Sequence, residues 1–372
     1  MTWDGQPRAR KQIMGVRSKR SRKPLHIALV YNAASGLVPE TPEDRGSMAD
    51  LLKMIRHMSR AMRSLGHRVT ILPLADDLFV FHRKLLRLNP DVVFNQYDDV
   101  VHGVFDEMLF AAIVQMMGFR VTGSPALALG LSRYKHTTSR LLQGLGIPIP
   151  PCTEVLEKVS EVDRHEWRFP LIVQPCHEDA GIGLNRNSVV RTKTALRNQV
   201  RHVLQEFKQP AIVQCFLPGR EFNVGIVGGK RLRRMPLAEV CYHDMPPEIP
   251  PIMSYAAKWL ENTTEYKKTS ILCPTEVEPQ LAEQLYDIAL RAFRAVGAWG
   301  YGRVDIRLDE EGVPRVLEVN CNASLEHDIG LARAAKKAGI SYPELLQMVI
   351  DAAMEDAPHT GSAPMQSLVG VQ

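Results

Sequence analysis

The 372-residue sequence contains no run of about 18 or more apolar residues, so it predicts no transmembrane helix. No apolar segment follows the basic residues at its start, and we therefore expect no secretory signal peptide. The six cysteines are scattered without a CxxC pair, which argues against a zinc ribbon or a disulfide framework. Together these absences predict a cytoplasmic protein with reduced, mostly buried thiols and no membrane partner.

Acidic side chains are scarce in one segment, residues 1–24. This segment carries eight basic side chains against a single acid, Asp4, and contributes +7 to a net charge of +5. The remaining chain therefore sums to −2, which is close to neutral. A basic arm can touch nucleic acid or anionic lipid, but most such arms are solvated and disordered. A nucleic-acid partner is for this reason not the favoured interpretation.

The rest of the composition is that of a globular protein, with 45% hydrophobic and 23% charged residues. The length suggests two or three packed units. Three short apolar runs in the first part predict strands, at 25–31, 69–72 and 91–94. The segments between and after them carry apolar residues at helical spacing, over 48–65, 78–88 and 107–117. Strands that alternate with helices favour a parallel α/β sheet.

A Gly- and Pro-rich stretch at 144–151 predicts a linker and turn, and the pattern changes beyond it. Further strands are predicted at 171–174, 211–215, 221–227, 302–308 and 315–319. Gly228 and Gly229 between two β-rich runs predict a hairpin. Helices are predicted over 279–296 and 342–355, and the polar tail after Ala357 resembles a disordered segment.

Polar residues alternate along the two adjacent strands near the end of the chain. Arg303, Asp305 and Arg307 share one face of the first strand, and Glu318 and Asn320 share one face of the second. Two carboxylates and an amide oxygen that converge in this way suit Mg²⁺. An ordinary solvent-facing hairpin would show the same alternation, and the pattern alone favours neither interpretation.

Two further segments could bind a nucleotide. The strand at 169–175 runs into a small-residue loop whose backbone N–H groups could wrap phosphate, although neither GxGxxG nor a P-loop is present. An apolar strand also leads through a Pro-Gly turn to Glu221, so that a base could lie against Phe216 and Leu217 with Glu221 on a ribose hydroxyl. Taken singly, a glycine loop and an apolar strand with a turn are the simpler interpretations.

The order of the motifs along the chain is more specific than any one of them. The segments occur in sequence at 132–135, 146–150, 172–175, 181–183, 219–222, 255–259, 303–305 and 318–320. Together they resemble the D-alanine–D-alanine ligase branch of the ATP-grasp superfamily, across about residues 25–355. The resemblance implies an α/β fold, α+β in its ATP-grasp part, with three subdomains and ATP between two antiparallel sheets.

The resemblance also implies limits for each part of the chain. They are an N-terminal α/β domain at 25–130 and an ATP-grasp domain at 131–355, while charge and composition predict the basic arm at 1–24 and the disordered tail at 356–372. Within the ATP-grasp domain, a small lobe is expected at 131–220 and a large lobe at 221–355.

The resemblance further assigns roles to individual residues. It implies that Lys135 and Lys258 contact phosphate and that Arg303 stabilises the transferring phosphoryl group and the tetrahedral intermediate. The residues implied to bind Mg²⁺ are Asp305, Glu318 and Asn320. Those implied to bind ATP elsewhere are Gln174, Ala180, Gly181, Gln214, Phe216, Leu217 and Glu221.

Several positions depart from the family pattern. Gln174 stands where the family usually has lysine, and Gln214 replaces a usual glutamate. The loops at 32–36, 95–103 and 320–324 lack the residues that the ligases use to orient their substrates. The altered loops argue against D-alanine as the substrate and leave ligase chemistry intact, whereas the missing lysine could mark an inactive relative.

The residues and the resemblance together therefore predict an ATP- and Mg²⁺-dependent carboxylate–amine ligase that acts on small amino acids or short peptides. A homodimer is an expectation from the resemblance alone. One alternative is a catalytically silent nucleotide-binding or scaffold protein. Another is a ligase that modifies a peptide or protein tail, with the basic arm docking an acidic partner.

Overall fold

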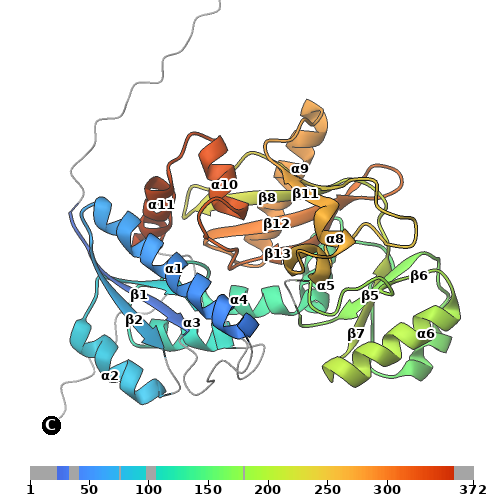
Figure 1. The fold of residues 1–372 in the computed structure, drawn as a ribbon, viewed down its shortest axis with the longest axis horizontal. Coiled ribbons are helices and arrows are strands. Elements are labelled where there is room, and N and C mark those ends of the chain that lie inside the picture. The colour runs from blue at the N-terminus through green and yellow to red at the C-terminus, as the bar shows by residue number, and fades with distance from the viewer. Residues whose placement is uncertain (1–22, 33–41, 75–76, 98–105, 179–180, 356–372) are drawn as a thin grey trace, which may run out of the picture.

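The computed structural model describes residues 23–32, 42–74, 77–97, 106–178 and 181–355 (Figure 1). Most of the predicted basic arm, the predicted tail and Ala180 lie outside these residues, as do parts of two substrate loops. No helix within the described ranges is long and apolar enough to cross a bilayer.

The first part of the chain forms a three-stranded parallel sheet of order β2-β1-β3, as its alternating pattern predicts. The strands are β1 His26–Asn32, β2 Arg68–Leu74 and β3 Val92–Gln96. Alternate side chains of β1 enter different cores: Ile27 and Leu29 pack with helix α1, while Ala28 and Val30 pack with α2 and α3. The three helices are α1 Pro42–Ser64, α2 Leu78–Leu88 and α3 Asp106–Met116.

Two short helices lead from this sheet to a small antiparallel sheet of order β4-β7-β5-β6. The helices are α4 Ala126–Arg133 and α5 Lys135–Gly144. The strands are β4 Glu154–Leu156, β5 Leu171–Pro175, β6 Val189–Val190 and β7 Ala211–Cys215. A 3-10 turn (Val159–Arg164), helix α6 (Lys193–His202) and a π turn (Val203–Phe207) accompany this sheet. Leu196 and Val200 of α6 are fully buried against it.

A larger antiparallel sheet follows, with the order β11-β10-β8-β12-β13 and with β9 paired to β8. Its strands are β8 Glu221–Gly228, β9 Arg233–Arg234, β10 Ala238–Tyr242, β11 Thr269–Leu272, β12 Gly300–Leu308 and β13 Pro314–Asn320. The predicted hairpin is confirmed, and Gly228 at its turn has a φ of +133° that an L side chain rarely adopts. The helices of this part are α7 Tyr255–Trp259, α8 Thr264–Lys267, α9 Pro279–Ala295, α10 Gly330–Lys337 and α11 Tyr342–Met354.

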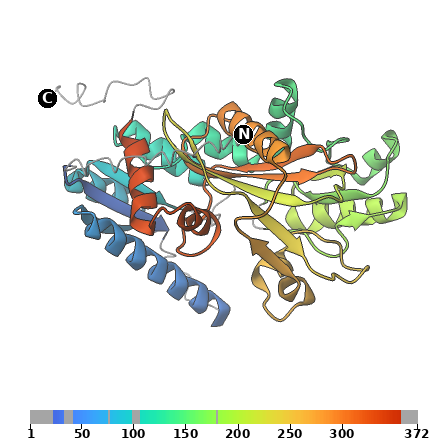
Figure 2. The same ribbon diagram turned by 90° about the horizontal axis from the view of Figure 1, so that it is seen from above.

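The two ends of the described chain share one core. Met58 and Met62 of α1 are buried with Leu345 and Val349 of α11, so the methionine spacing of α1 marks a core face as expected. Figure 2 shows α11 beside α1 and β1, with the small sheet at the far side of the large one. The C-terminal helix therefore fixes the parallel sheet to the large antiparallel sheet.

Candidate functional site

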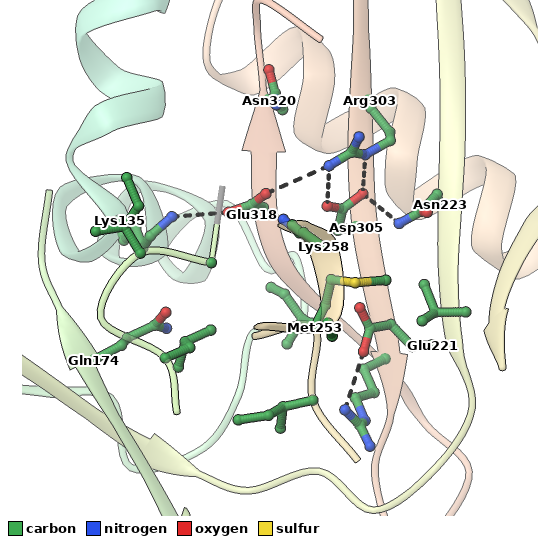
Figure 3. Close-up of a pocket in the computed structure, with 18 of the residues that line it drawn as sticks. Lys135, Gln174, Glu221, Asn223, Met253, Lys258, Arg303, Asp305, Glu318 and Asn320 are labelled. Atoms are coloured by element: carbon green, nitrogen blue, oxygen red, sulfur yellow. Dashed lines mark hydrogen bonds and ion pairs between the residues drawn. The ribbon is translucent and has the colours of Figure 1, made fainter. Parts of the chain in front are cut away.

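A cavity of about 810 Å³ lies between the small and the large antiparallel sheets. Its walls include residues of β5 and β7 on one side and of β8, β12 and β13 on the other. Every predicted site residue that the structure describes lines this cavity: Lys135, Gln174, Gly181, Gln214, Phe216, Leu217, Glu221, Lys258, Arg303, Asp305, Glu318 and Asn320. Figure 3 shows several of them converging from these elements. The structure thus brings together positions spread over nearly 190 residues of chain.

Two carboxylates from neighbouring strands form the centre of the site. Asp305 of β12 and Glu318 of β13 are directly opposite in the antiparallel register, and a bulge follows them. Arg303 donates to both oxygens of Asp305, at 2.7 and 2.8 Å, and lies 3.8 Å from Glu318. Lys135, at the start of α5, donates to Glu318 at 2.8 Å, and Asn223 of β8 donates to Asp305 at 2.8 Å.

The charges of this cluster perturb one another strongly. The Lys135 ammonium lowers the pKa of Glu318 far below its ordinary range, in spite of burial. Burial lowers the pKa of Lys258 and raises that of Asp305. Burial alone would also lower the pKa of Arg303, but the neighbouring carboxylates outweigh it and raise that pKa. Three cations against two carboxylates leave a net positive centre, which suits a polyanionic ligand.

The donor set of this centre fits Mg²⁺. Among the residues that the structure describes, no three His, Cys, Asp or Glu gather at one point to hold a metal ion. Asp305 and Glu318 provide two carboxylates, and the Asn320 side-chain oxygen, which accepts from the Asn322 N–H at 3.0 Å, lies on the same strand. Mg²⁺ in phosphate sites is bound by one or two carboxylates and takes its other ligands from phosphate oxygens and water. Asp305, Glu318 and Asn320 are therefore the side chains that could hold it.

Two predicted site residues on the small sheet form a chain of amides. Gln174 of β5 donates to the Gln214 side-chain oxygen at 3.5 Å, a long hydrogen bond. Gln214 of β7 in turn donates to the Thr153 hydroxyl at 3.1 Å, and this hydroxyl donates to the Pro150 carbonyl at 2.8 Å. Two of the positions that depart from the family pattern, Gln174 and Gln214, are therefore in contact with each other.

The glycine loop meets the segment that precedes Lys258. Gly181 has a φ of +81°, and a Cβ at this position would lie 2.8 Å from the backbone of Ser254 and Tyr255. Only glycine permits both this conformation and this close approach. Because α7 carries Lys258, the loop and the lysine border the same side of the cavity.

A buried arginine of the site has no role in the sequence-based interpretation. Arg307, two residues beyond Asp305 on β12, also lines the cavity and pairs with Glu221 at 3.1 Å. Its place on the same strand face as Arg303 and Asp305 follows from their alternation. Its partner on β8 does not, because that partner is 86 residues away in sequence.

Comparison with known proteins identifies the family. A family model described as "D-ala D-ala ligase C-terminus" matches residues 141–351, which is more than half of the chain. The chain belongs to the D-alanine–D-alanine ligase family. Members of this family are ATP-grasp ligases, which confirms the predicted fold class and enzyme class, and they use ATP and Mg²⁺.

Two D-alanine–D-alanine ligases are among the relatives and solved structures to which this chain is similar. A D-alanine–D-alanine ligase of a Marinomonas species is 30% identical over 64% of this chain and 70% of its own length. The protein y4sG of Sinorhizobium fredii is 29% identical over 88% of this chain and 97% of its own. A D-alanine–D-alanine ligase of Bacillus anthracis, crystallised with ATP, has a TM-score of 0.65 at 18% identity and covers 89% of this chain and 97% of that one. This last likeness supports the shared fold.

Proposed function

We propose that this D-alanine–D-alanine ligase relative is an ATP-dependent carboxylate–amine ligase that forms an amide bond through an acyl phosphate and releases ADP and phosphate. The observation that carries the proposal is the cluster of Lys135, Lys258 and Arg303 around Asp305 and Glu318, in one cavity between two sheets. Such a cluster suits the triphosphate of ATP, and its adenosine would extend toward Phe216 and Leu217.

The chemistry needs an activated carboxylate, because a free carboxylate would have to expel an oxide. In the proposed reaction a carboxylate oxygen of the first substrate attacks the γ-phosphorus, and the bond from that phosphorus to the ADP oxygen breaks. The amine of the second substrate then attacks the acyl carbon, loses a proton, and expels phosphate. Bound Mg²⁺ would supply neutralising charge for the β- and γ-phosphates.

The side chains of the site would act mainly by charge and position. Arg303 is held by both oxygens of Asp305, so its guanidinium is preorganised for oxygens that gain negative charge. Lys135 and Lys258 act as point charges, since a phosphate contact requires no proton transfer from them. Asp305, Glu318 and Asn320 are the proposed Mg²⁺ ligands.

Small amino acids or short peptides are the proposed substrates. D-alanine, which gives the relatives their name, is not favoured because the sequence of the substrate loops differs here. A homodimer and the unit limits at 130 and 220 remain predictions. The limit at 220 is supported by the end of β7 in the small sheet and the start of β8 in the large sheet on either side of it.

A silent nucleotide-binding protein is the second candidate, and glutamine at position 174 favours it. Its neighbour Gln214 weighs against this candidate. By resemblance, Gln214 stands in place of a glutamate and Gln174 in place of a lysine. The two amides are in contact, and the two replacements together leave the net charge of the site unchanged.

The test is ADP release from ATP and Mg²⁺ in the presence of a panel of amino acids and dipeptides. The proposal expects release that depends on an amine substrate and that disappears in Asp305→Asn. Asp287→Asn is a matched control, because this aspartate lies on the exposed side of α9, with 65% of its side chain exposed. ATP binding without turnover across the whole panel would favour the silent protein.

A further inference from the structure

Arg307 is almost completely buried in the part of the cavity where Phe216 lies, with 5% of its side chain exposed. Its Nε donates to the Gly219 carbonyl at 3.1 Å, and its Nη1 donates to the Pro251 carbonyl at 2.8 Å. The guanidinium carbon lies 5.1 Å from the centre of the Phe216 ring. One side chain thus connects the turn after β7, the segment before α7 and the ring predicted to contact the base.

The fourth contact of Arg307 is with Glu221, which faces it across strands β12 and β8. Arg307 Nη1 donates to Glu221 Oε2 at 3.1 Å, and the Tyr242 hydroxyl donates to the same oxygen at 3.0 Å. The other carboxylate oxygen, Oε1, accepts no hydrogen bond from the described residues. It is also not one of their fully buried polar atoms, so it remains accessible. In Figure 3 the Glu221 carboxylate faces into the site beside Met253.

The two oxygens of the Glu221 carboxylate differ in the hydrogen bonds that they can still accept. Oε2 is saturated by two protein donors, so only Oε1 can accept a hydrogen bond from a ligand in the cavity. Hydroxyl groups are the donors that the sugar of a nucleotide offers to a carboxylate, and the ribose carries two of them. A carboxylate fixed at one oxygen loses little freedom on binding, which favours affinity.

We propose that Arg307 is a positioning residue that fixes the Glu221 carboxylate with Oε1 directed at the ribose, so that the site selects ribonucleotides over deoxyribonucleotides. This inference rests on the proposed function, because it requires that a nucleotide occupies the cavity. Burial raises the pKa of Glu221, and the charge of Arg307 opposes this rise.

The experiment is calorimetric binding of ADP, 2′-deoxy-ADP and 3′-deoxy-ADP, each with Mg²⁺, to the full chain. A hydrogen bond to a charged group corresponds to about 10-fold or more in affinity. The wild type is therefore expected to bind ADP about 10-fold more tightly than at least one deoxy form. Arg307→Met should lose this preference by weakening ADP and leaving the deoxy form nearly unchanged.

The control is Arg315→Met, because Arg315 faces Arg307 in the β12–β13 register but is held by Asp309 outside the cavity. It should keep the wild-type preference. If Arg307→Met does not fold, Arg307→Lys and Tyr242→Phe give the answer: the first keeps a charge and should retain part of the preference, and the second removes one donor and should reduce it.

The outcomes separate this inference from the proposed function. A wild type that binds ADP but not more tightly than both deoxy forms overturns the inference and leaves the ligase proposal standing. The inference is also overturned if Arg307→Met, or both Arg307→Lys and Tyr242→Phe, keep the full wild-type preference for ADP over the deoxy forms. A wild type that binds none of the three nucleotides contradicts the proposed function itself.

Discussion

Gln174 and Gln214 offer a way to test whether the departures from the family pattern compensate each other. The two amides are in contact, and Gln214 has only 5% of its surface exposed. We expect Gln214→Glu alone to be harmful, because it places a carboxylate where only a hydroxyl and an amide can face it. Gln174→Lys restores the charge that the family usually carries, but without a partner.

The magnitude follows from burial and distance. A buried carboxylate without a cationic partner costs about 3 kcal/mol of stability. A lysine and a glutamate about 4 Å apart attract one another by about 4 kcal/mol at an effective dielectric constant of about 20. Part of that attraction is lost to desolvation, so we expect a coupling free energy of about 2 kcal/mol between the two substitutions.

The assay is a double-mutant cycle with the two single variants and the double variant. The free energy of unfolding in urea and the affinity for ATP are measured for each. We expect the double variant to be more stable than the sum of the single effects by about 2 kcal/mol, and to bind ATP at least as well as the wild type. Additive effects would refute the idea that the two positions act as one unit.

Three further predictions concern other parts of the molecule. Burial lowers the pKa of Lys258 below the ordinary 10.5, so this lysine loses its charge at a lower pH than an exposed lysine does. We therefore expect kcat/KM for ATP to fall as the pH rises through that lowered pKa. Lys258→Arg should move this alkaline limb upward even if the rate drops, and an unmoved limb would assign it to another group. Gly181→Ala should weaken ATP binding about 10-fold, because alanine is strained in the left-handed conformation of this residue and its Cβ would displace the loop. Calorimetry would measure this change in affinity, and an unchanged affinity would exclude the loop from the site. Leu345→Ala, at a fully buried position of α11, should lower the free energy of unfolding by about 3 kcal/mol in a urea titration, and a change below about 1 kcal/mol would contradict the shared core.

The sequence predicts the features of this fold that depend on local periodicity. The alternation in β12 and β13 anticipates that Asp305 and Glu318 share a face, because side chains of a strand point to opposite sides in turn. The helical spacing of α1 likewise anticipates a buried methionine face. Both features need only the residue order and the geometry of one element.

Features that depend on which elements meet could not be predicted in this way. The contact of Arg307 with Glu221 requires that β12 pair with β8, and the core around Leu345 requires that α11 pack on α1. Strand β6 has only two residues, which are too few to show a period. Such contacts are set by tertiary packing, to which a single sequence gives no local signal.

In the proposed reaction, ATP turnover is coupled to amide formation through an acyl phosphate. The most direct test uses a carboxylate substrate labelled with ¹⁸O, together with ATP, Mg²⁺ and the amine that gives the highest ADP release. We expect equal amounts of ADP and amide, with one ¹⁸O atom transferred to the released phosphate. ADP release without amide, or amide without label in the phosphate, would contradict it.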